Sequence, residues 1–212
     1  MNKVKQKATQ DTKQILIDTA SELIWKNSYG AVSVDDICKA ANVKKGSFYH
    51  FFPSKVDLAL AALEEFYQNK KEAYDRIFSP QTPALKRFEQ MADLVVEMQE
   101  KAAAKHGQVC GCPHASLGCE MAGQEDAIRK KLDEITKRFE RYYESGIRDL
   151  IADGMLPADT NIKAKAQEVF TYLLGQLTFA RIQNDIDILK RELKPGLRRI
   201  LVKDSFSWGK SK

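Results

Sequence analysis

The sequence has no long hydrophobic run and little cysteine. No stretch of about 18 apolar residues, the length that a membrane-spanning helix requires, occurs in the 212 residues. The lysine-rich start MNKVKQKATQDTKQ lacks the apolar segment of a secretory signal, so we expect a cytoplasmic chain without a membrane partner. Four cysteines are too few for a small disulfide scaffold. With 43% hydrophobic and 30% charged residues, the composition excludes a disordered tail or a collagen-like fibre and indicates one or two globular domains.

Motifs of the common catalytic classes are also missing. The chain contains no GxSxG, no P-loop and no HExxH motif. Its three histidines leave few groups for acid–base catalysis near neutral pH. We therefore expect neither an enzyme nor a bound cofactor.

Positive charge is concentrated near the start of the chain. The formal net charge of the whole chain is +5. Residues 1–58 contain nine lysines and no arginine against six acidic residues, which places +3 of that excess in about a quarter of the length. A local cationic face of this kind suits phosphate binding, although a solvated basic end is the simpler interpretation. Lysines 3, 5 and 7 form either a minor-groove arm or a solvated tail.

The spacing of apolar residues predicts helix almost throughout. Long helices are expected over residues 12–27 and 54–78, and short ones from Ser33 and over residues 45–51. Gly30 is expected to end the first helix in a left-handed conformation. Pro195 predicts a break or kink within the last apolar segment, residues 186–201. Because no alternating strand pattern occurs, the expected fold is all-α, with about nine helices.

Residues 33–55, SVDDICKAANVKKGSFYHFFPSK, have the pattern of a helix-turn-helix, with two helices of about seven residues and a short turn. Ser33 and Asp36 suit the start of the first helix. Asn42 can adopt the left-handed conformation that a tight turn requires. The N-terminal part of the second helix of such a motif lies in the major groove, and Gly46 allows a close approach there. The residues expected to project outward from this helix are Lys44, Lys45, Ser47, Tyr49 and His50.

From about Thr12 to Leu58 the sequence resembles the TetR family of bacterial transcriptional regulators. The resemblance rests on an ordered pattern that is more specific than a helix-turn-helix alone. Its residues are Ile15-Leu16, Ala20, Leu23, Tyr29-Gly30, Val32-Ser33-Val34, Ile37, Ala40, Val43, Gly46-Ser47-Phe48-Tyr49, Phe51-Phe52, Ser54-Lys55 and Leu58.

This resemblance implies a fold and a function. The fold is an N-terminal three-helix helix-turn-helix head, residues 1–53, followed by a helical effector-binding and dimerisation domain, residues 54–205, and a frayed tail, residues 206–212. The function is a homodimeric, ligand-responsive regulator, most often a repressor, that a small-molecule effector releases from a palindromic operator in double-stranded DNA.

The resemblance also assigns roles in DNA binding. Lys44, Lys45 and Ser47 are implied as residues that read bases or line the groove floor, beside Gly46.

Phosphate contacts are implied for a second group of residues. Lys55 would clamp a phosphate with the help of a helix N-terminus. The alternatives are that Tyr49 packs inside the head and that His50 is only a surface residue. The group implied to contact phosphates is Thr12, Ser33, Tyr49, His50 and Lys55.

A cysteine cluster lies in VCGCPHASLGCEMA. Cys110, Cys112, His114 and Cys119 offer the ligand types of a zinc site or a thiol switch, but the spacing is diagnostic of neither. The simpler interpretation is that Cys112-Pro113 starts a helix and that the thiols pack as small apolar groups. In this segment the chain resembles a TetR subgroup with a Gly-Cys-Pro entry to its sixth helix, followed by a glutamate like Glu120. Thiol or metal sensing remains the alternative function, and no metal is expected in the leading one.

In this family a cavity of the C-terminal domain binds the effector. The aromatic and methionine residues there predict an apolar or aromatic effector with one or two polar anchors, although such residues are more often ordinary core. The candidate wall and anchor residues are Phe66, Phe88, Met91, Met98, His114, Phe139, Tyr143, Phe170 and Gln176.

A dimer surface is predicted at the end of the chain. Residues 164–182 are apolar over a wide arc, and residues 186–201 carry an apolar stripe. We expect both segments to pair with their symmetry mates in a four-helix bundle, with Gly175 permitting close approach. The alternative is that both apolar surfaces are satisfied within one chain.

Overall fold

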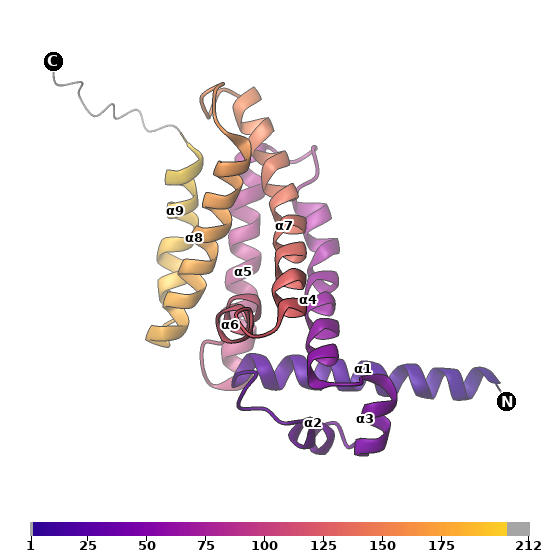
Figure 1. The fold of residues 1–212 in the computed structure, drawn as a ribbon. Coiled ribbons are helices and arrows are strands. Elements are labelled where there is room, and N and C mark those ends of the chain that lie inside the picture. Colours follow the sequence, from indigo (N-terminus) through magenta and orange to yellow (C-terminus); the bar gives the residue numbers. More distant parts are fainter. Residues whose placement is uncertain (1, 203–212) are drawn as a thin grey trace. The chain divides into compact units, whose positions relative to one another are not determined.

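The computed structural model describes the backbone of residues 2–202 and the side chains of residues 11–202. Over residues 2–202 it contains nine α-helices and no strand, which confirms the all-α prediction (Figure 1). The predicted frayed tail and the side chains of lysines 3, 5 and 7 lie outside the described parts. The helices are α1 (Asn2–Lys26), α2 (Val34–Ala40), α3 (Lys45–Phe51), α4 (Lys55–Ile77), α5 (Ala84–His106), α6 (Pro113–Met121), α7 (Asp126–Ala152), α8 (Ile162–Gln183) and α9 (Asp187–Leu201).

The chain divides into two compact units. The first unit comprises Met1–Lys71 and Cys112–Ile135, and the second comprises Glu72–Gly111 and Thr136–Lys212. Helices α4 and α7 therefore contribute residues to both units. The compact units divide within α4 and not at residue 53. They are defined by compactness and not by function, so the predicted boundary between a DNA-binding and an effector-binding domain stays a prediction.

The head of the first unit is built on α1, α2 and α3, as the helix-turn-helix pattern predicts (Figure 1). Leu16, Ile37 and Phe48 are fully buried and form the centre of its core. Ser33 caps α2 in a complete capping box with Asp36. Asn42 has φ 52°, so the left-handed turn between α2 and α3 is confirmed.

Helix α1 begins at Asn2, well before the predicted start at residue 12. The prediction followed the apolar stripe, which is absent from the first residues. Residues 2–11 nevertheless contain no proline or glycine and several strong helix formers, so the backbone remains helical beyond the stripe.

The second unit has an aromatic cluster at its centre, made by residues of α4, α5 and α7 together with Phe78. Tyr143 and Phe88 are almost completely buried. Gly146 allows this packing, because a Cβ at its position would lie 2.7 Å from Cε2 of Phe88. Ring centroids within the cluster are 5.0 to 6.5 Å apart, a spacing at which aromatic pairs attract. The members are Tyr74, Phe78, Phe88, Phe139, Tyr142 and Tyr143.

Helix α9 continues through Pro195 without a break, so of the two predicted outcomes only the kink stays a prediction. Tyr172 of α8 donates a hydrogen bond of 2.7 Å to the Glu192 carbonyl near this proline. The apolar stripe of α9 was predicted to pair with a symmetry mate. It is instead buried within the single chain, where α9 contacts α5 and α8. The buried stripe comprises Ile188, Leu189, Leu193, Leu197 and Leu201.

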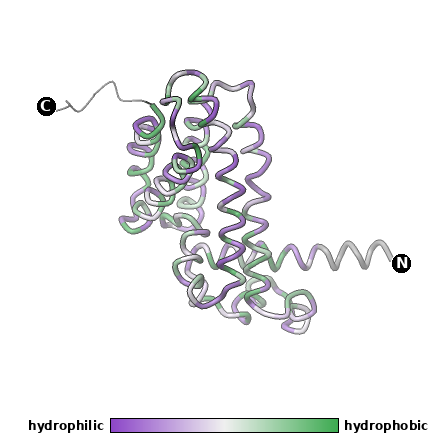
Figure 2. The backbone as a smooth tube through the Cα atoms, turned by 45° about the horizontal axis from the view of Figure 1, so that its top comes forward, coloured by the Kyte–Doolittle hydropathy of each residue, from purple (hydrophilic) through white to green (hydrophobic). Residues whose placement is uncertain are grey.

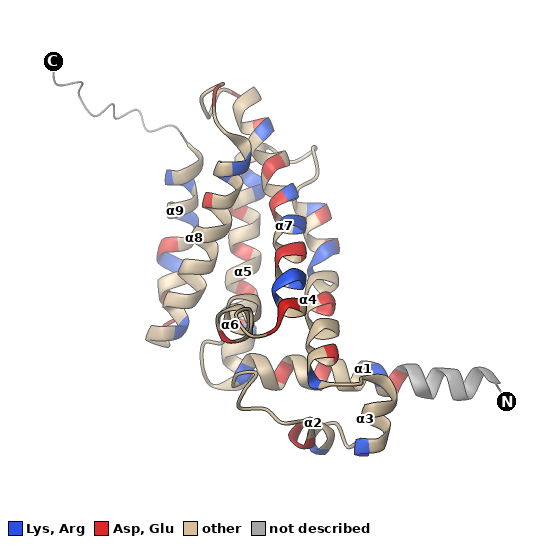
Figure 3. Ribbon diagram, in the orientation of Figure 1, with Lys and Arg blue, Asp and Glu red and all other residues tan. Residues whose placement is uncertain are grey.

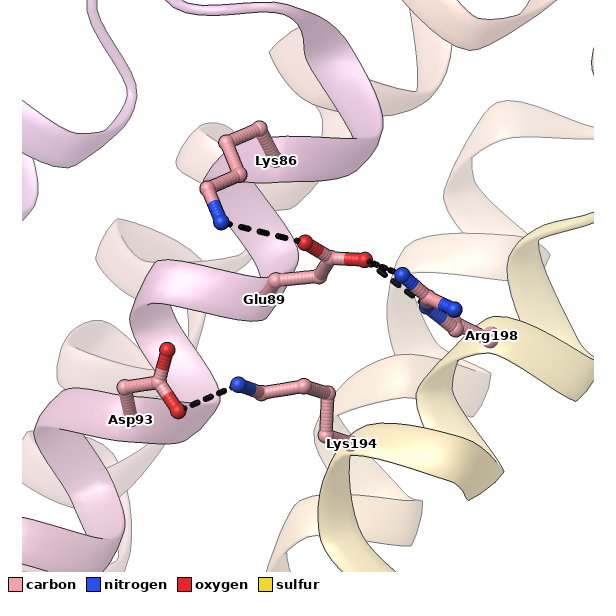
Figure 4. Close-up of polar contacts among 5 residues, drawn as sticks. All are labelled: Lys86, Glu89, Asp93, Lys194 and Arg198. Atoms are coloured by element: carbon pink, nitrogen blue, oxygen red, sulfur yellow. Dashed lines mark hydrogen bonds and ion pairs between the residues drawn. The ribbon is translucent and has the colours of Figure 1, made fainter.

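Ion pairs also join α5 to α9 (Figure 4). Nε of Arg198 donates to Glu89 at 2.7 Å, and Lys194 pairs with Asp93 at 2.6 Å. Burial alone would raise the pKa of Glu89, but hydrogen bonds and charge from Arg198, and then from Lys86, outweigh burial and lower this pKa. Helix α9 is thus held by apolar contacts on one side and by charge pairs at its edge.

Hydrophobic and hydrophilic residues alternate along the helices in the described part of the chain (Figure 2). None of these helices is both long and apolar enough to cross a membrane. The apolar faces instead point into the two units, as the burial of Leu58 on α4 and Ile135 on α7 illustrates.

Candidate functional site

Helix α3 brings most of the predicted DNA-reading residues together at the surface of the head. Lys44 directly precedes the helix, and Lys45, Tyr49 and His50 are exposed along it, whereas Ser47 is half-buried. Tyr49 leaves 49% of its surface exposed although it is aromatic, so it does not pack inside the head. A Cβ added to Gly46 would meet no atom within 4 Å, so space beside the backbone is open there.

Charge at this surface is positive but partly paired. Figure 3 shows lysine at the start of α3 and acidic residues on α2. Nζ of Lys45 lies 2.8 Å from Asp35, and both side chains are exposed. The hydrogen bond that Lys45 donates to Asp35, followed by the negative charge of Asp35, raises the pKa of Lys45. Because exposed ion pairs are weak, Lys45 can exchange Asp35 for another anionic partner.

Two predicted phosphate contacts have other roles within the head. Ser33 donates from its hydroxyl to Asp36 at 2.6 Å and accepts from the Asp36 backbone N–H at 3.1 Å, so it serves mainly as a helix cap. Thr12 is half-buried on α1. Phosphate contacts by either residue stay predictions.

Lys55 is half-buried and its ammonium is bonded within the head, so its phosphate contact stays a prediction. Its ammonium donates hydrogen bonds of 2.7 Å to the carbonyls of Tyr29 and Val32. It also lies 3.8 Å from the centroid of the Tyr29 ring. Burial lowers the pKa of Lys55. In this structure, therefore, Lys55 fixes the loop between α1 and α2.

Glu120 of α6 holds the same loop from the other side. Its carboxylate accepts the backbone N–H of Tyr29 at 2.9 Å and that of Gly30 at 2.5 Å. Gly30 does not have the predicted left-handed conformation, since it is absent from the positive-φ residues of the described chain. Its small size matters instead, because a Cβ there would lie 2.6 Å from Oε1 of Glu120. The sequence contains no local signal for this contact, which joins residues 90 positions apart.

The cysteine cluster does not assemble into a metal site. Among the described residues, no group of three or more His, Cys, Asp or Glu side chains is placed to hold a metal ion. All four cysteines are free; Cys110 and Cys112 are buried, whereas Cys119 is exposed. Cys112-Pro113 starts α6, as the simpler interpretation predicts. Burial raises the pKa of the Cys112 thiol, which disfavours the reactive thiolate.

Lys70 of α4 was not predicted from the sequence as a functional residue. Its ammonium lies 3.7 Å from the centroid of the Phe66 ring. The residue is half-buried, and desolvation by burial lowers its pKa to about 8. An electrostatic interaction with Cys112 opposes this shift. His114, two residues further along α6, is buried, and burial lowers its pKa to about 4.

The predicted effector residues of the second unit lie mostly in its core. Phe88, Phe139 and Tyr143 belong to the aromatic cluster, and Met91 is fully buried. Met98 on α5 and Phe170 and Gln176 on α8 are half-buried. Oε1 of Gln176 is buried without a hydrogen-bond partner among the described residues, so it is available to a ligand.

A surface groove of about 390 Å³ lies between α5 and α9. Ala92, Val96, Leu189 and Pro195 form its apolar part, with charged side chains around them. None of the predicted effector residues lines this groove.

Known sequence families match most of this chain. Residues 16–62 match the profile of bacterial regulatory proteins of the tetR family. Residues 84–194 match the profile of the tetracyclin repressor-like C-terminal domain.

Individual relatives agree with the profiles. The transcriptional regulator AcuR of Cereibacter sphaeroides is 33% identical over 171 residues, which cover 80% of this chain and 76% of AcuR. The repressor NemR of Escherichia coli is 27% identical over 136 residues, covering 58% of this chain and 61% of NemR.

Solved structures share the fold. The regulatory protein TetR from Rhodobacter sphaeroides has a TM-score of 0.77 and 31% identity, with 89% of this chain and 98% of that chain covered. The reduced form of E. coli NemR has a TM-score of 0.75 at 21% identity, covering 91% of this chain and 98% of that chain.

Proposed function

Because the chain belongs to the TetR family of bacterial transcriptional regulators, we propose that it binds a palindromic operator as a homodimer and leaves it when a small-molecule effector binds. Repression is the more common mode in the family, so we assign it the role of a repressor. A regulator of this kind acts in the bacterial cytoplasm, at the nucleoid. It needs no cofactor and carries out no catalysis.

The exposed surface of α3 carries the proposal of DNA binding. Lys44, Lys45, Tyr49 and His50 project from one short helix around the open position of Gly46. Lysine and tyrosine suit base edges and phosphate oxygens, and the absence of a side chain at Gly46 lets the backbone approach the groove floor. Two such helices must lie about 34–36 Å apart to enter successive major grooves.

Helix α8 supplies the proposed dimer surface. Phe179 and Ile182 are 51% and 70% exposed, which is unusual for such apolar side chains. Gly175 on the same helix has open space beside it, so a second helix can approach closely. We assign this face to the homodimer because α9 uses its own apolar stripe within the chain.

The effector is proposed to be a small molecule with an apolar or aromatic body. It must bind more tightly to the conformation with the wrong head spacing, since equal affinity for both conformations shifts nothing. Gln176, with its buried and unpartnered Oε1, and Tyr143 support polar anchoring in the second unit.

Thiol sensing through Cys110, Cys112 and Cys119 is the alternative. The exposed thiol of Cys119 favours it, whereas the raised pKa of Cys112 opposes it. Treatment with diamide or peroxide distinguishes effector sensing from thiol sensing. Effector sensing predicts unchanged operator affinity, whereas a loss of operator affinity that dithiothreitol reverses would support thiol sensing.

Fluorescence anisotropy with DNA from upstream of the gene tests the proposed function. We expect nanomolar binding that weakens with salt, and a loss of at least about tenfold in Tyr49→Ala. Arg191→Ala is the matched control, because Arg191 is an exposed residue of α9 in the second unit. Specific binding by α3 would be refuted if wild type, Tyr49→Ala and Arg191→Ala all bound this DNA with the same affinity, and bound an unrelated duplex equally well.

A further inference from the structure

We propose that Asp35 is a specificity-determining residue of the DNA-binding head. By pairing with Lys45, it keeps this lysine from strengthening the binding of DNA of any sequence, and it reserves the lysine for base edges of the operator. The inference rests on the proposed function, because it takes α3 as the helix that enters the major groove. Asp35 of α2 and Lys45 of α3 belong to the same compact unit.

The helix-turn-helix segment has few acidic residues. Residues 33–55 contain four lysines and only two acids, Asp35 and Asp36. The carboxylate of Asp36 is used within α2, where it completes the capping box with Ser33. Asp36 also places a negative charge in the first turn of the helix, where the helix dipole favours it. The cap at the start of α2 therefore does not involve Asp35.

Asp35 is paired instead with the first residue of α3. Its Oδ1 lies 2.8 Å from Nζ of Lys45, and the two side chains are 70% and 54% exposed. Lys44, the preceding residue, is exposed as well and has no such ion pair over residues 11–202. The two adjacent lysines at the start of α3 thus differ, because the charge of Lys45 is already balanced and that of Lys44 is not.

A balanced charge matters most on DNA of the wrong sequence. Such binding depends almost entirely on basic side chains that neutralise phosphates and release counterions. A lysine whose charge is cancelled by a carboxylate releases few counterions. A phosphate that displaced Asp35 from Lys45 would also leave the carboxylate beside negatively charged DNA, which repels it. Asp35 should therefore weaken the binding of any duplex by about the contribution of one phosphate contact.

The same pair costs little on the operator. Lys45 is the first residue of α3, and the N-terminal part of such a helix faces the bases of the major groove. A lysine ammonium has three N–H donors, so a hydrogen bond to Asp35 leaves two for O6 and N7 of a guanine. Asp35 therefore holds the ammonium without using up the donors that read a base. The pair raises the ratio of operator affinity to affinity for other DNA.

Fluorescence anisotropy with two duplexes of equal length tests the proposal: DNA from upstream of the gene and an unrelated sequence. Asp35→Asn should bind the unrelated duplex about five- to tenfold more tightly at about 0.1 M salt, with a salt slope steeper by about one, because the released Lys45 gains a phosphate. Its affinity for the upstream DNA should change by less than about twofold, since Lys45 contacts bases there. The ratio of the two affinities should therefore fall.

Two further variants serve as controls. Asp35→Glu keeps the carboxylate and should keep the affinity ratio of wild type. Asp18→Asn removes an exposed acid of α1 in the same unit, so it changes the net charge equally and should bind both duplexes as wild type does. A purely structural role of the ion pair would instead lower the urea unfolding midpoint of Asp35→Asn and would not tighten its binding of unrelated DNA.

A double-mutant cycle links the effect to Lys45. In a Lys45→Met background, Asp35→Asn should no longer tighten the binding of the unrelated duplex. The proposal is overturned if Asp35→Asn binds that duplex no more tightly than wild type, if both duplexes gain equally, if Asp18→Asn gains as much, or if the gain persists without Lys45. Equal binding of both duplexes by wild type would instead refute the proposed function, while the cycle on the unrelated duplex would still decide whether Asp35 restrains Lys45.

Discussion

The carboxylate of Glu120 occupies the space in which any residue other than glycine at position 30 would place its Cβ. Oε1 of Glu120 would lie 2.6 Å from that Cβ, and it accepts the Gly30 N–H at 2.5 Å. A residue of α6 and a loop of the DNA-binding head are thereby fitted to each other. The contact makes α6 a part of the head's support and not only of the effector domain.

Replacing Glu120 with Gln should destabilise the first unit by about 1–2 kcal/mol, because an amide oxygen accepts more weakly than a carboxylate and cannot hold both N–H groups equally. Gly30→Ala should cost about 1 kcal/mol, because the Glu120 side chain must move away. Urea unfolding measures both. Asp159→Asn, in an exposed loop, is the control. If Glu120→Gln had the same unfolding midpoint as this control, Glu120 would not stabilise the loop between α1 and α2.

Enlarging Gly196 should disturb the packing of α8 on α9. A Cβ there would lie 1.7 Å from the Tyr172 hydroxyl, which donates to the Glu192 carbonyl and is therefore not free to move away. We expect Gly196→Ala to cost about 1–3 kcal/mol of unfolding free energy. Tyr172→Ala should abolish most of that cost in a double-mutant cycle, whereas additive effects would mean that the two residues do not clash.

Lys70 should make stability depend on pH in the alkaline range. Its pKa is about 8 in the folded chain against 10.5 for an ordinary lysine, so between these values the unfolded chain binds more protons. The free energy of unfolding should therefore rise as the pH increases from about 8 to 10.5, by at most about 3 kcal/mol. Lys70→Met should remove this rise and should be more stable than wild type at pH 7. Parallel pH profiles of the two proteins, measured by urea unfolding, would contradict the burial of an unpaired ammonium.

A charge on the exposed face of α8 should prevent dimer formation. Ile182→Glu places a carboxylate where the apolar side chain is 70% exposed in the single chain. Sedimentation velocity should show a dimer for wild type and a monomer for this variant, with operator affinity reduced accordingly. Met155→Glu changes another exposed apolar residue, outside the helices, and should remain dimeric. A dimeric Ile182→Glu protein would assign the interface to another surface.

The head was predictable from the sequence because its signals are local. Ser33 and Asp36 lie three residues apart in the capping box, and Asn42 marks a turn whose conformation few other residues adopt. The exposure of Tyr49 follows from its place in the α3 pattern.

Contacts between distant segments were not predictable in the same way. An isolated lysine such as Lys70 is normally assigned to a solvated helix face, and only the fold shows that it is half-buried with its ammonium over the Phe66 ring. Lys55 resembles a phosphate contact by position, yet the carbonyls that it bonds to belong to a loop more than 20 residues away. The apolar stripe of α9 has the same sequence pattern whether it faces a second chain or the interior of its own chain. Only the position of α5 in the fold shows that the stripe is internal.

Selection of operator DNA from a random duplex library tests the central claim most directly. The wild-type protein should enrich a palindrome whose half-sites are centred about one helical turn, or a small multiple of it, apart, because a two-fold dimer presents two copies of α3. Lys45→Ala/Tyr49→Ala should enrich no sequence under the same conditions, while Arg191→Ala enriches the same palindrome as wild type. The account is contradicted if wild type enriches no sequence, or if the α3 variant enriches the same palindrome equally well.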